Sequence, residues 1–354
     1  MLNFLKIIAS LFYGAAVVIR NKLYDTNIFV HKEINDVVTI VVGNITVGGT
    51  GKTPHSEFLL NNLQKDFKVA LLSRGYKRKT KNFRYVETTS TAIEVGDEPL
   101  QIKRKFPDVI VAVDADRVRG VKYIKEKYPD IDVIVLDDAF QHRRLKPSLS
   151  VLLCNYWRPI NKDKMLPWGT LRDEQNQKCR ADIVFVTKCP QTTSPIDMRI
   201  VSHDLNLMPY QQLFFTTLEY GELISVFDAN KPAKTDKIVA LAGIANPKLF
   251  EEYISANFAK PRMLQFSDHH NFSQKDIKNI CKNIDENELF ITTEKDAMRL
   301  MLHNNFSEEQ KAKMFYLPIK IKFLNNTEEK ITTYLIDYVK KYKACFSNKN
   351  KSQK

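Results

Sequence analysis

Chemistry is first suggested by a glycine-rich stretch, Gly43-Asn44-Ile45-Thr46-Val47-Gly48-Gly49-Thr50-Gly51-Lys52-Thr53, which follows the apolar run Val37–Val42. Glycines let backbone N–H groups converge on phosphate oxygens, a lysine adds a charge for the β and γ phosphates, and a threonine hydroxyl can ligate Mg²⁺. Helical apolar spacing follows at Phe58, Leu59, Leu60 and Leu63. We therefore expect residues 46–53, which include Lys52 and Thr53, to form an ATP phosphate-binding loop between a strand and a helix.

The loop departs from the common pattern at its start. That pattern has a first glycine five residues before Gly51, where this chain has Thr46. The remainder resembles the double-glycine variant of the motif, with Val47 where that variant often has a lysine. A glycine-rich turn without a ligand is the alternative, and the positions of strand, helix and Lys52-Thr53 disfavour it.

A second chemical element is the apolar strand Val133–Leu136, which ends in Asp137 and Asp138. A carboxylate at such a position can hold Mg²⁺ opposite the loop threonine. Adjacent strand residues point to opposite faces, so we expect one of the pair to meet the metal, and either is a candidate. Turn chemistry at a strand end is the alternative. The predicted metal ligands are Thr53 with Asp137 or Asp138.

Composition narrows the function class. A chain of 354 residues favours two domains, and a net charge of +13 favours an anionic ligand such as a nucleotide, a membrane surface or a phosphorylated substrate. The five cysteines form no Cys-x-x-Cys pair, which argues against a zinc site and a disulfide framework. These features indicate a protein of a reducing compartment.

The N-terminus is unusually apolar. Thirteen uncharged residues lie between Lys6 and Arg20, fewer than the roughly 20 needed to span a bilayer. Export behind a signal peptide would separate the loop from ATP. An interfacial helix fits better, with Lys6, Arg20 and Lys22 at anionic headgroups, and a core helix packed on the protein is the alternative. The apolar residues that would enter the acyl boundary are Phe4, Leu5, Ile8, Leu11 and Phe12.

Apolar runs alternate with helical patterns along the rest of the chain. This alternation predicts an α/β fold of the P-loop NTPase kind, with a doubly wound, mostly parallel sheet, a smaller second α/β domain and an N-terminal apolar helix. Polar residues that close the strands should gather at one edge; they are Ser73-Arg74, Asp114, Asp137-Asp138 and Thr187-Lys188. The expected units are an apolar helix in 1–30, a kinase core in 31–215, a linker in 216–236, a small domain in 237–340 and a basic tail in 341–354.

Further stretches resemble the tetraacyldisaccharide 4′-kinase family. They are Ser73-Arg74-Gly75-Tyr76, Val95-Gly96-Asp97-Glu98-Pro99, Asp116-Arg117-Val118-Arg119-Gly120, Asp137-Asp138-Ala139-Phe140-Gln141-His142-Arg143-Arg144-Leu145, Leu166-Pro167-Trp168-Gly169-Thr170-Leu171-Arg172-Asp173 and Asp268-His269-His270. The resemblance runs to about Met298, in the family's order, with Ala139 where many members have Gly. It implies a kinase at the cytoplasmic face of the inner membrane, bound peripherally. Such a kinase transfers the γ-phosphate of ATP, with Mg²⁺, to the 4′-hydroxyl of an anionic glycolipid, tetraacyldisaccharide 1-phosphate, giving lipid IVA.

The resemblance also implies catalytic roles. Asp97 would accept the proton of the sugar hydroxyl, and His269 from the second domain would orient or tune that carboxylate, beside Lys52 on the phosphates. From the residues alone, Asp97 would be a helix N-cap before Pro99 and a lone histidine would be structural. Arginines suit the substrate phosphate because a guanidinium binds phosphate oxygens in pairs. The candidate substrate-binding residues are Arg74, Arg117, Arg119, Gln141, His142 and Arg172.

Three rival interpretations are weaker. A GTPase should have an Asp where Thr187-Lys188-Cys189-Pro190 has Pro190. A nucleic-acid module could use the basic cluster 74–81, but no binding fold surrounds it, and we expect neither nucleic acid nor an obligate protein partner. A non-enzymatic ATP switch would need neither Asp97 nor His269.

Overall fold

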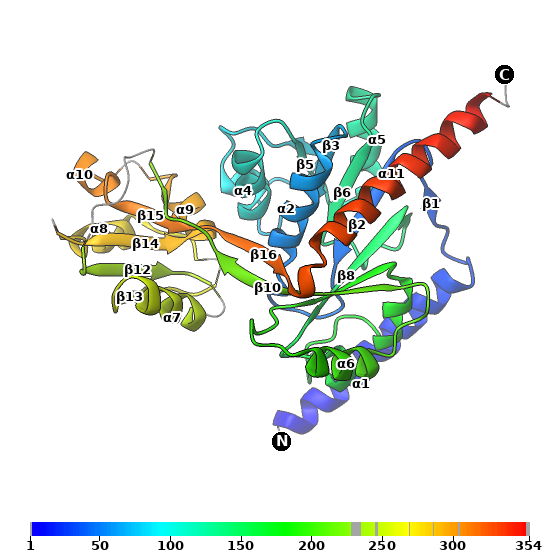
Figure 1. Ribbon diagram of the computed structural model, residues 1–354, viewed down its shortest axis with the longest axis horizontal. Coiled ribbons are helices and arrows are strands. Elements are labelled where there is room, and N and C mark those ends of the chain that lie inside the picture. Colours follow the sequence, from blue (N-terminus) through cyan, green and yellow to red (C-terminus); the bar gives the residue numbers. More distant parts are fainter. Residues whose placement is uncertain are drawn as a thin grey trace.

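The computed structural model describes residues 2–227, 235–244, 247–268, 270–285, 287–303 and 305–351. Its largest feature is a nine-stranded sheet of order β16-β10-β9-β8-β2-β6-β3-β5-β4, parallel except for the two edge strands (Figure 1). The predicted apolar runs supply its centre. The strands are β2 (Val38–Gly43), β3 (Val69–Ser73), β4 (Arg84–Tyr85), β5 (Ile110–Val113), β6 (Val133–Asp137), β8 (Leu149–Asn155), β9 (Ile183–Thr187), β10 (Gln212–Tyr220) and β16 (Ile319–Phe323).

Helices cover both faces of this sheet, as predicted for a doubly wound fold. Alternate strand residues serve different faces: Val133 and Val135 join one core, and Ile134 and Leu136 join the other. The first core lies under α2 (Lys52–Leu63), α3 (Ala92–Val95), α4 (Asp97–Lys105) and α11 (Glu328–Lys351). The second lies under α5 (Arg117–Lys127), the 3₁₀ turn η1 (Ile160–Lys162) and α6 (Pro195–Leu205). A second 3₁₀ turn is η2 (Gln175–Arg180), and β1 (Lys32–Glu33) pairs with β7 (Leu145–Lys146).

A smaller five-stranded sheet of order β11-β15-β14-β12-β13 lies beside the first (Figure 1). The apolar cores on its two faces include Phe290 on one side and Phe250 on the other, both fully buried. Its strands are β11 (Ile224–Ser225), β12 (Ile238–Ala242), β13 (Arg262–Gln265), β14 (Leu289–Thr293) and β15 (Met314–Leu317). Its helices are α7 (Lys248–Asn257), α8 (Gln274–Lys282), α9 (Glu294–Leu300) and α10 (Glu308–Lys311).

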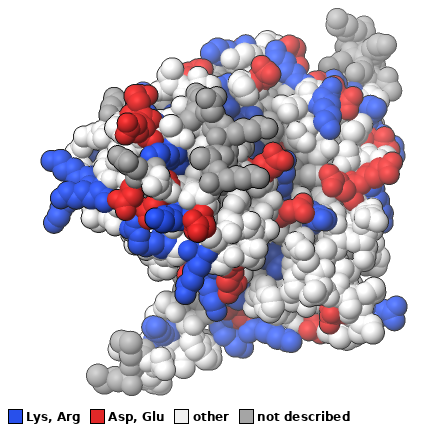
Figure 2. Space-filling model, turned by 60° about the vertical axis from the view of Figure 1, so that its left-hand side comes forward, with Lys and Arg blue, Asp and Glu red and all other residues white. Residues whose placement is uncertain are grey.

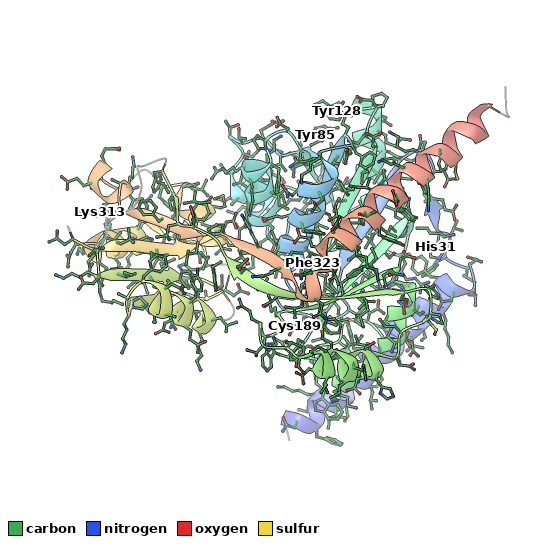
Figure 3. The ribbon with its side chains drawn as sticks, viewed as in Figure 1. His31, Tyr85, Tyr128, Cys189, Lys313 and Phe323 are labelled. Atoms are coloured by element: carbon green, nitrogen blue, oxygen red, sulfur yellow. The ribbon has the colours of Figure 1, made fainter. Side chains whose placement is uncertain are left out.

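The end of the chain returns to the larger sheet. Strand β16 pairs antiparallel with β10, and Phe323 packs among Phe58, Phe185 and Phe214 at the junction of the two sheets (Figure 3). Helix α11 then packs on the first core through Ile331, Leu335 and Val339.

Because of these contacts, the domain boundaries in the structure differ from those expected from the sequence. Residues 319–340 do not continue the smaller sheet, residues 341–351 continue helix α11 rather than a tail, and residues 216–220 of the expected linker are the end of β10. The reason is that β10 needs an antiparallel partner at its open edge, and β16 supplies it from far along the chain. We propose that the smaller domain comprises residues 221–318.

The N-terminal helix α1 (Leu2–Asp25) runs past both ends of the uncharged stretch. At 24 residues it is roughly 36 Å long. Among the residues that the structure describes, it is the one helix whose length and composition would allow it to cross a membrane. Its polar side is docked, because Ser10 donates to the Met165 carbonyl and Asn21 donates to Asp173 and Glu174. Most of its apolar surface is exposed, which contradicts the alternative of a core helix.

Charges of both signs share the surface in Figure 2, where Lys and Arg side chains alternate with Asp and Glu rather than forming one continuous basic stripe. Charges on the surface of the protein also pair locally, for example Lys68 with Asp130 at 2.6 Å and Arg84 with Glu94 at 2.8 Å.

Substitution of Gly43, the last residue of β2, tests how tightly the residues beneath the loop are packed. A Cβ there would lie 2.7 Å from Phe140 Cβ and 3.0 Å from its backbone nitrogen. We expect Gly43→Ala to lower the free energy of unfolding by about 1–3 kcal/mol through overpacking, measured by urea denaturation. Gly14→Ala is the matched control, since its Cβ would meet only Met165 Cγ at 3.7 Å in a helix. Equal stability of the two variants would contradict this account.

Candidate functional site

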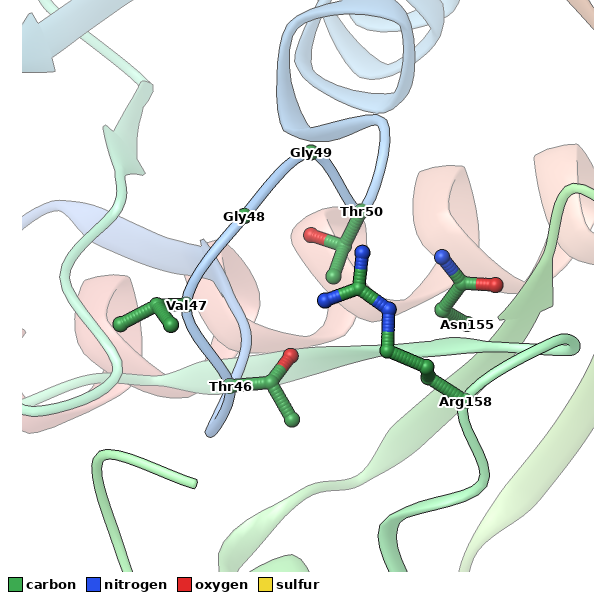
Figure 4. A pocket seen from close by; sticks show the side chains of 7 residues that line it. All are labelled: Thr46, Val47, Gly48, Gly49, Thr50, Asn155 and Arg158. Carbon is green, nitrogen blue, oxygen red and sulfur yellow. The ribbon is translucent and has the colours of Figure 1, made fainter. Parts of the chain in front are cut away.

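The glycine-rich loop joins β2 to α2 at the centre of the larger sheet, as the sequence predicts (Figure 4). Gly48 and Gly51 have φ values of +98° and +85°, a region that favours glycine. The loop is braced within itself, since the Asn44 amide donates to Thr50 Oγ1 at 2.8 Å, and from outside, since the Val47 N–H donates to the Thr170 carbonyl at 2.8 Å. These bonds hold the loop just before the N-terminus of α2, where the unpaired backbone N–H groups of a helix attract anions.

His55 supports the loop from below. Its Nδ1 lies 2.7 Å from the Gly51 carbonyl and its Nε2 lies 3.0 Å from Thr216 Oγ1. A carbonyl only accepts, so Nδ1 carries a hydrogen and donates it to Gly51; in the neutral ring Nε2 then has no hydrogen and faces the Thr216 hydroxyl as an acceptor. Burial lowers the His55 pKa to about 4, outweighing the bond to Gly51. The ring therefore stays neutral at physiological pH and adds no charge beneath the loop.

Two further basic side chains lie at the loop. Arg158 comes from the turn after β8 and, with Asn155, lines the same hollow as residues 46–50 (Figure 4). Lys188 follows β9 and places Nζ 3.7 Å from where a Cβ on Gly49 would be. Burial, then Arg158 and Lys295, lower the Lys188 pKa. Several cations crowd around the loop, which suits a polyanionic ligand.

The two carboxylates after β6 both lie on the Lys52 side. We expected only one of the two carboxylates at the metal position, because side chains alternate along a strand. Asp138 has a φ of +45° and has left the strand, so this alternation does not apply to it. Asp138 lies 3.9 Å from Lys52 Nζ and pairs with Arg172. Asp137 accepts from the Ser56 and Ser73 hydroxyls at 3.1 and 3.4 Å.

Their environments push the two pKa values apart. Burial raises the pKa of Asp137 to about 6, with further repulsion from Glu98 and Asp138. Burial also opposes ionisation of Asp138, but attraction to Lys52 and Arg172 outweighs it and lowers that pKa. The pair is thus an oxygen-rich, negatively charged spot facing the first turn of α2.

The predicted arginines divide by what they already bind. Arg117 is buried and donates to the carbonyls of Asp114, Ala115, Asp137 and Asp138, and Arg119 grips Asp114 through two bonds of 2.8 Å. Arg172 donates to Asp138 and to Asn44. These three arginines therefore hold the loop and strand ends in place, whereas Arg74 is exposed at the end of β3.

Gln141 and His142 lie in the turn after Asp138. The Gln141 amide donates to the Asn44 carbonyl at 2.6 Å, which braces the loop. His142 is half-buried, and burial together with Arg117 lowers its pKa. Neither contact by itself indicates a substrate role.

Asp97 begins α4, and Gly96, at φ +92°, is the N-cap residue rather than Asp97. Its carboxylate points to the smaller domain, where Arg299 of α9 donates to Asp97 Oδ2 from Nε at 2.9 Å and from Nη2 at 2.6 Å. Next to it, Glu98 pairs with Lys295. Helices α4 and α9 thus join the two domains at the candidate base. His269, the expected partner of Asp97, lies outside the described residues.

Arg158, Lys295 and Arg299 were not predicted from the sequence, whereas Lys188 belongs to the polar strand ends that were expected at this edge. Thr293–Asp296 closes another predicted strand, so the rule that polar strand ends gather at one edge could also have found Lys295. Arg158 and Arg299 follow no such pattern. Their positions depend on the turn after β8 and on the packing of α9 against α4, which are tertiary features.

Comparison with known proteins gives one consistent result. The family model described as tetraacyldisaccharide-1-P 4′-kinase matches residues 2–339. A tetraacyldisaccharide 4′-kinase of Phocaeicola vulgatus is 45% identical over 341 residues, covering 93% of each chain. One from Flavobacterium johnsoniae is 40% identical over 334 residues, covering 94% of this chain and 95% of the relative. A crystal structure of LpxK from Aquifex aeolicus in complex with ATP aligns with TM-score 0.77 at 28% identity, covering 96% of this chain and all of that one.

The buried His55 gives a pH-dependence of stability. Its folded pKa of about 4 lies below the unfolded value, so the unfolded state binds more protons between pH 6.5 and 4. The stability present above pH 6.5 is lost as pH falls through this window, by on the order of 3 kcal/mol. We expect the unfolding free energy of the wild type to fall by about that much more than that of His55→Gln, measured by urea denaturation at both pH values. Parallel curves would contradict a buried neutral ring.

Proposed function

Because this chain belongs to the tetraacyldisaccharide-1-P 4′-kinase family, its activity is transfer of the ATP γ-phosphate to the 4′-hydroxyl of tetraacyldisaccharide 1-phosphate, and we propose that residues 46–53, Asp97 and the carboxylates after β6 carry it out. The observation that carries this proposal is the meeting of three parts at one sheet edge. They are the glycine-rich loop with Lys52, the pair Asp137 and Asp138, and the N-terminus of α4, where Glu98 is close enough to raise the Asp137 pKa.

ATP fits the loop by charge and shape. The backbone N–H groups of residues 48–53 would cradle the phosphates, and Lys52 would contact the β and γ phosphates. Arg158 and Lys188 lie where further phosphate oxygens or the nucleotide's sugar would pass. Lys52 lies 3.9 Å from Asp138, so that carboxylate would hold the ammonium in place before ATP arrives.

The residues also fit Mg²⁺, which is bound at kinase sites by one or two carboxylates with substrate phosphates and water. Asp137, Asp138 and the Thr53 hydroxyl offer only oxygen donors, and two carboxylates that repel each other call for a cation. When bound, Mg²⁺ would neutralise charge on the phosphates. Ser56 and Ser73 would orient Asp137, while Arg172 would hold Asp138.

Transfer requires a base for the acceptor. The 4′-hydroxyl oxygen forms a bond to the γ-phosphorus, the bond from that phosphorus to the β–γ bridging oxygen breaks, and ADP leaves with the electron pair. Asp97 would take the hydroxyl proton, and Lys52 with the loop amides would stabilise charge on the transferred group. His269 remains a proposed partner of Asp97. Arg74, exposed beside this edge, is our candidate for the substrate phosphate, because Arg117, Arg119 and Arg172 are engaged with the protein.

A membrane-embedded acceptor requires access to the lipid surface. We propose that α1 lies in the interface at the cytoplasmic face of the inner membrane. Leu11 and Phe12 are 68% and 75% exposed, and Phe4, Leu5 and Ile8 are exposed as well. Lys6 and Lys22 lie toward the ends of the same helix, where anionic headgroups would attract them. The docked polar side of α1 would keep the active site near that surface.

Transfer of labelled γ-phosphate from ATP/Mg²⁺ to tetraacyldisaccharide 1-phosphate in detergent micelles tests the assignment. We expect Lys52→Ala and Asp97→Asn each to lower kcat by roughly a hundredfold or more, since one loses phosphate contact and the other the base. Asp97→Asn should still bind ATP. Asp130→Asn, at an exposed ion pair, is the control and should match the wild type. Full activity of Asp97→Asn would remove Asp97 from the mechanism, and a wild type that binds ATP without transfer would indicate a nucleotide switch.

Membrane binding has its own test. We expect the double variant Leu11→Glu/Phe12→Glu to reduce co-sedimentation with anionic phospholipid vesicles by roughly tenfold or more, because two apolar side chains no longer enter the lipid. Leu249→Glu/Phe258→Glu changes another exposed apolar pair, in the smaller domain, and should bind as the wild type does. A similar loss in both variants would show that added negative charge, not α1, explains the result.

A further inference from the structure

Helix α9 carries an unusual concentration of buried charge. Glu294, Asp296 and Arg299 are all buried although the helix has only seven residues. Buried charges are costly unless they are paired and hydrogen-bonded. The partners of these residues therefore indicate what the helix does.

Asp296 is the fixed point of the arrangement. Its Oδ2 accepts from the Gly243 N–H at 2.8 Å and from Thr293 Oγ1 at 2.7 Å, and its Oδ1 accepts from Arg299 Nη1 at 2.8 Å. A Cβ on Gly243 would lie 2.8 Å from Asp296 Oδ1, so a glycine is needed at that position. The ends of β12 and β14 thus hold Asp296, and Asp296 holds the guanidinium.

The remaining face of that guanidinium crosses to the larger domain. Arg299 Nε and Nη2 donate to Asp97 Oδ2 at 2.9 and 2.6 Å, and Arg299 is only 4% exposed against 18% for the Asp97 side chain. A planar guanidinium that is bound on one side has little rotational freedom, so it fixes the oxygen on its other side. Positioning of a catalytic group to within a fraction of an ångström affects rate strongly.

We propose that Arg299 is a positioning residue for the phosphoryl transfer, which holds the Asp97 carboxylate in place from the second domain. The inference rests on the proposed role of Asp97 as the proton acceptor. It assigns a specific function to the contact between α4 and α9: the chain Gly243–Asp296–Arg299–Asp97 transmits the position of the smaller domain to the base.

A general tie between the domains is the competing explanation. The same interface contains a second arginine, Arg104 of α4, whose Nη1 contacts the sulfur atoms of Met301 and Met298 at 2.8 and 3.7 Å. Arg104 crosses the interface without touching Asp97 in the contacts that the structure gives for it, so it serves as a matched control for the loss of an interface arginine.

The test compares Arg299→Gln, Arg299→Lys and Arg104→Gln in the kinase assay, with unfolding midpoints measured in urea. We expect Arg299→Gln to lower kcat by roughly ten- to a hundredfold and to leave the KM for ATP within about twofold of the wild type. Arg299→Lys, which keeps the charge but not the planar fork, should fall in between. Arg104→Gln should keep kcat within about twofold of the wild type, even if its urea unfolding midpoint falls by as much as that of Arg299→Gln.

A double variant decides whether the effect passes through Asp97. In an Asp97→Asn background, Arg299→Gln should change the residual kcat by less than about twofold, because the group it positions is already gone. If the loss is instead as large as in the wild-type background, or if Arg299→Gln behaves as Arg104→Gln does, the inference is overturned. Should Arg299→Gln fail to fold, Arg299→Lys decides on the same criteria.

Different results would reject the role of Arg299 and the role of Asp97. Loss of activity in Asp97→Asn together with a normal kcat in both Arg299 variants would reject Arg299 and leave the proposed base intact. Normal activity in Asp97→Asn would reject the base itself, and the role of Arg299 with it.

Discussion

Compensation of buried negative charge at the end of β6 is the constraint on which the site depends. Asp137 and Asp138 lie side by side at the carboxyl edge of the sheet, with Glu98 close by, and burial would drive protons onto them without compensation. Lys52 and Arg172 supply charge, Ser56 and Ser73 supply hydroxyls, and Arg117 binds the carbonyls of both residues. Each of these groups also belongs to the loop, to α2 or to a family motif. The hydrogen bonds and ion pairs that compensate the two carboxylates therefore also place the residues of the proposed nucleotide site.

Pairing of buried charges also explains why the two domains meet where they do. Helix α4 presents Asp97, Glu98 and Lys105, and α9 presents Arg299, Lys295 and Glu294 in complementary order. Ion pairs of this kind add little stability when exposed but fix geometry when buried. An interface made of paired charges is also more easily separated than an apolar one.

Sequence patterns predicted the elements of this fold well and its long-range connections poorly. The apolar runs that form β2 and β6 are confirmed within a residue or two because a parallel strand buried on both faces must be apolar throughout. The return of β16 and α11 was missed. Strand β16 alternates apolar and charged residues, Ile319-Lys320-Ile321-Lys322-Phe323, and nothing in that pattern specifies β10 as its partner. The loop and the strand-end carboxylates could be recognised because their chemistry is local, whereas the contact of Arg299 with Asp97 spans about two hundred residues.

The N-terminal helix is coupled to the catalytic centre through two consecutive residues. Tyr13 donates to the Arg172 carbonyl at 3.1 Å and Asn21 donates to Asp173 at 2.8 Å, while the Arg172 side chain reaches Asp138. Asp173 is fully buried and is further approached by Arg20 and Arg180. Removing α1 would therefore leave a buried carboxylate short of partners and loosen the segment that holds Arg172. Inactivity of a truncated chain would report this structural coupling as well as lost membrane contact, so only changes on the exposed face of α1 separate binding to lipid from support of the active site.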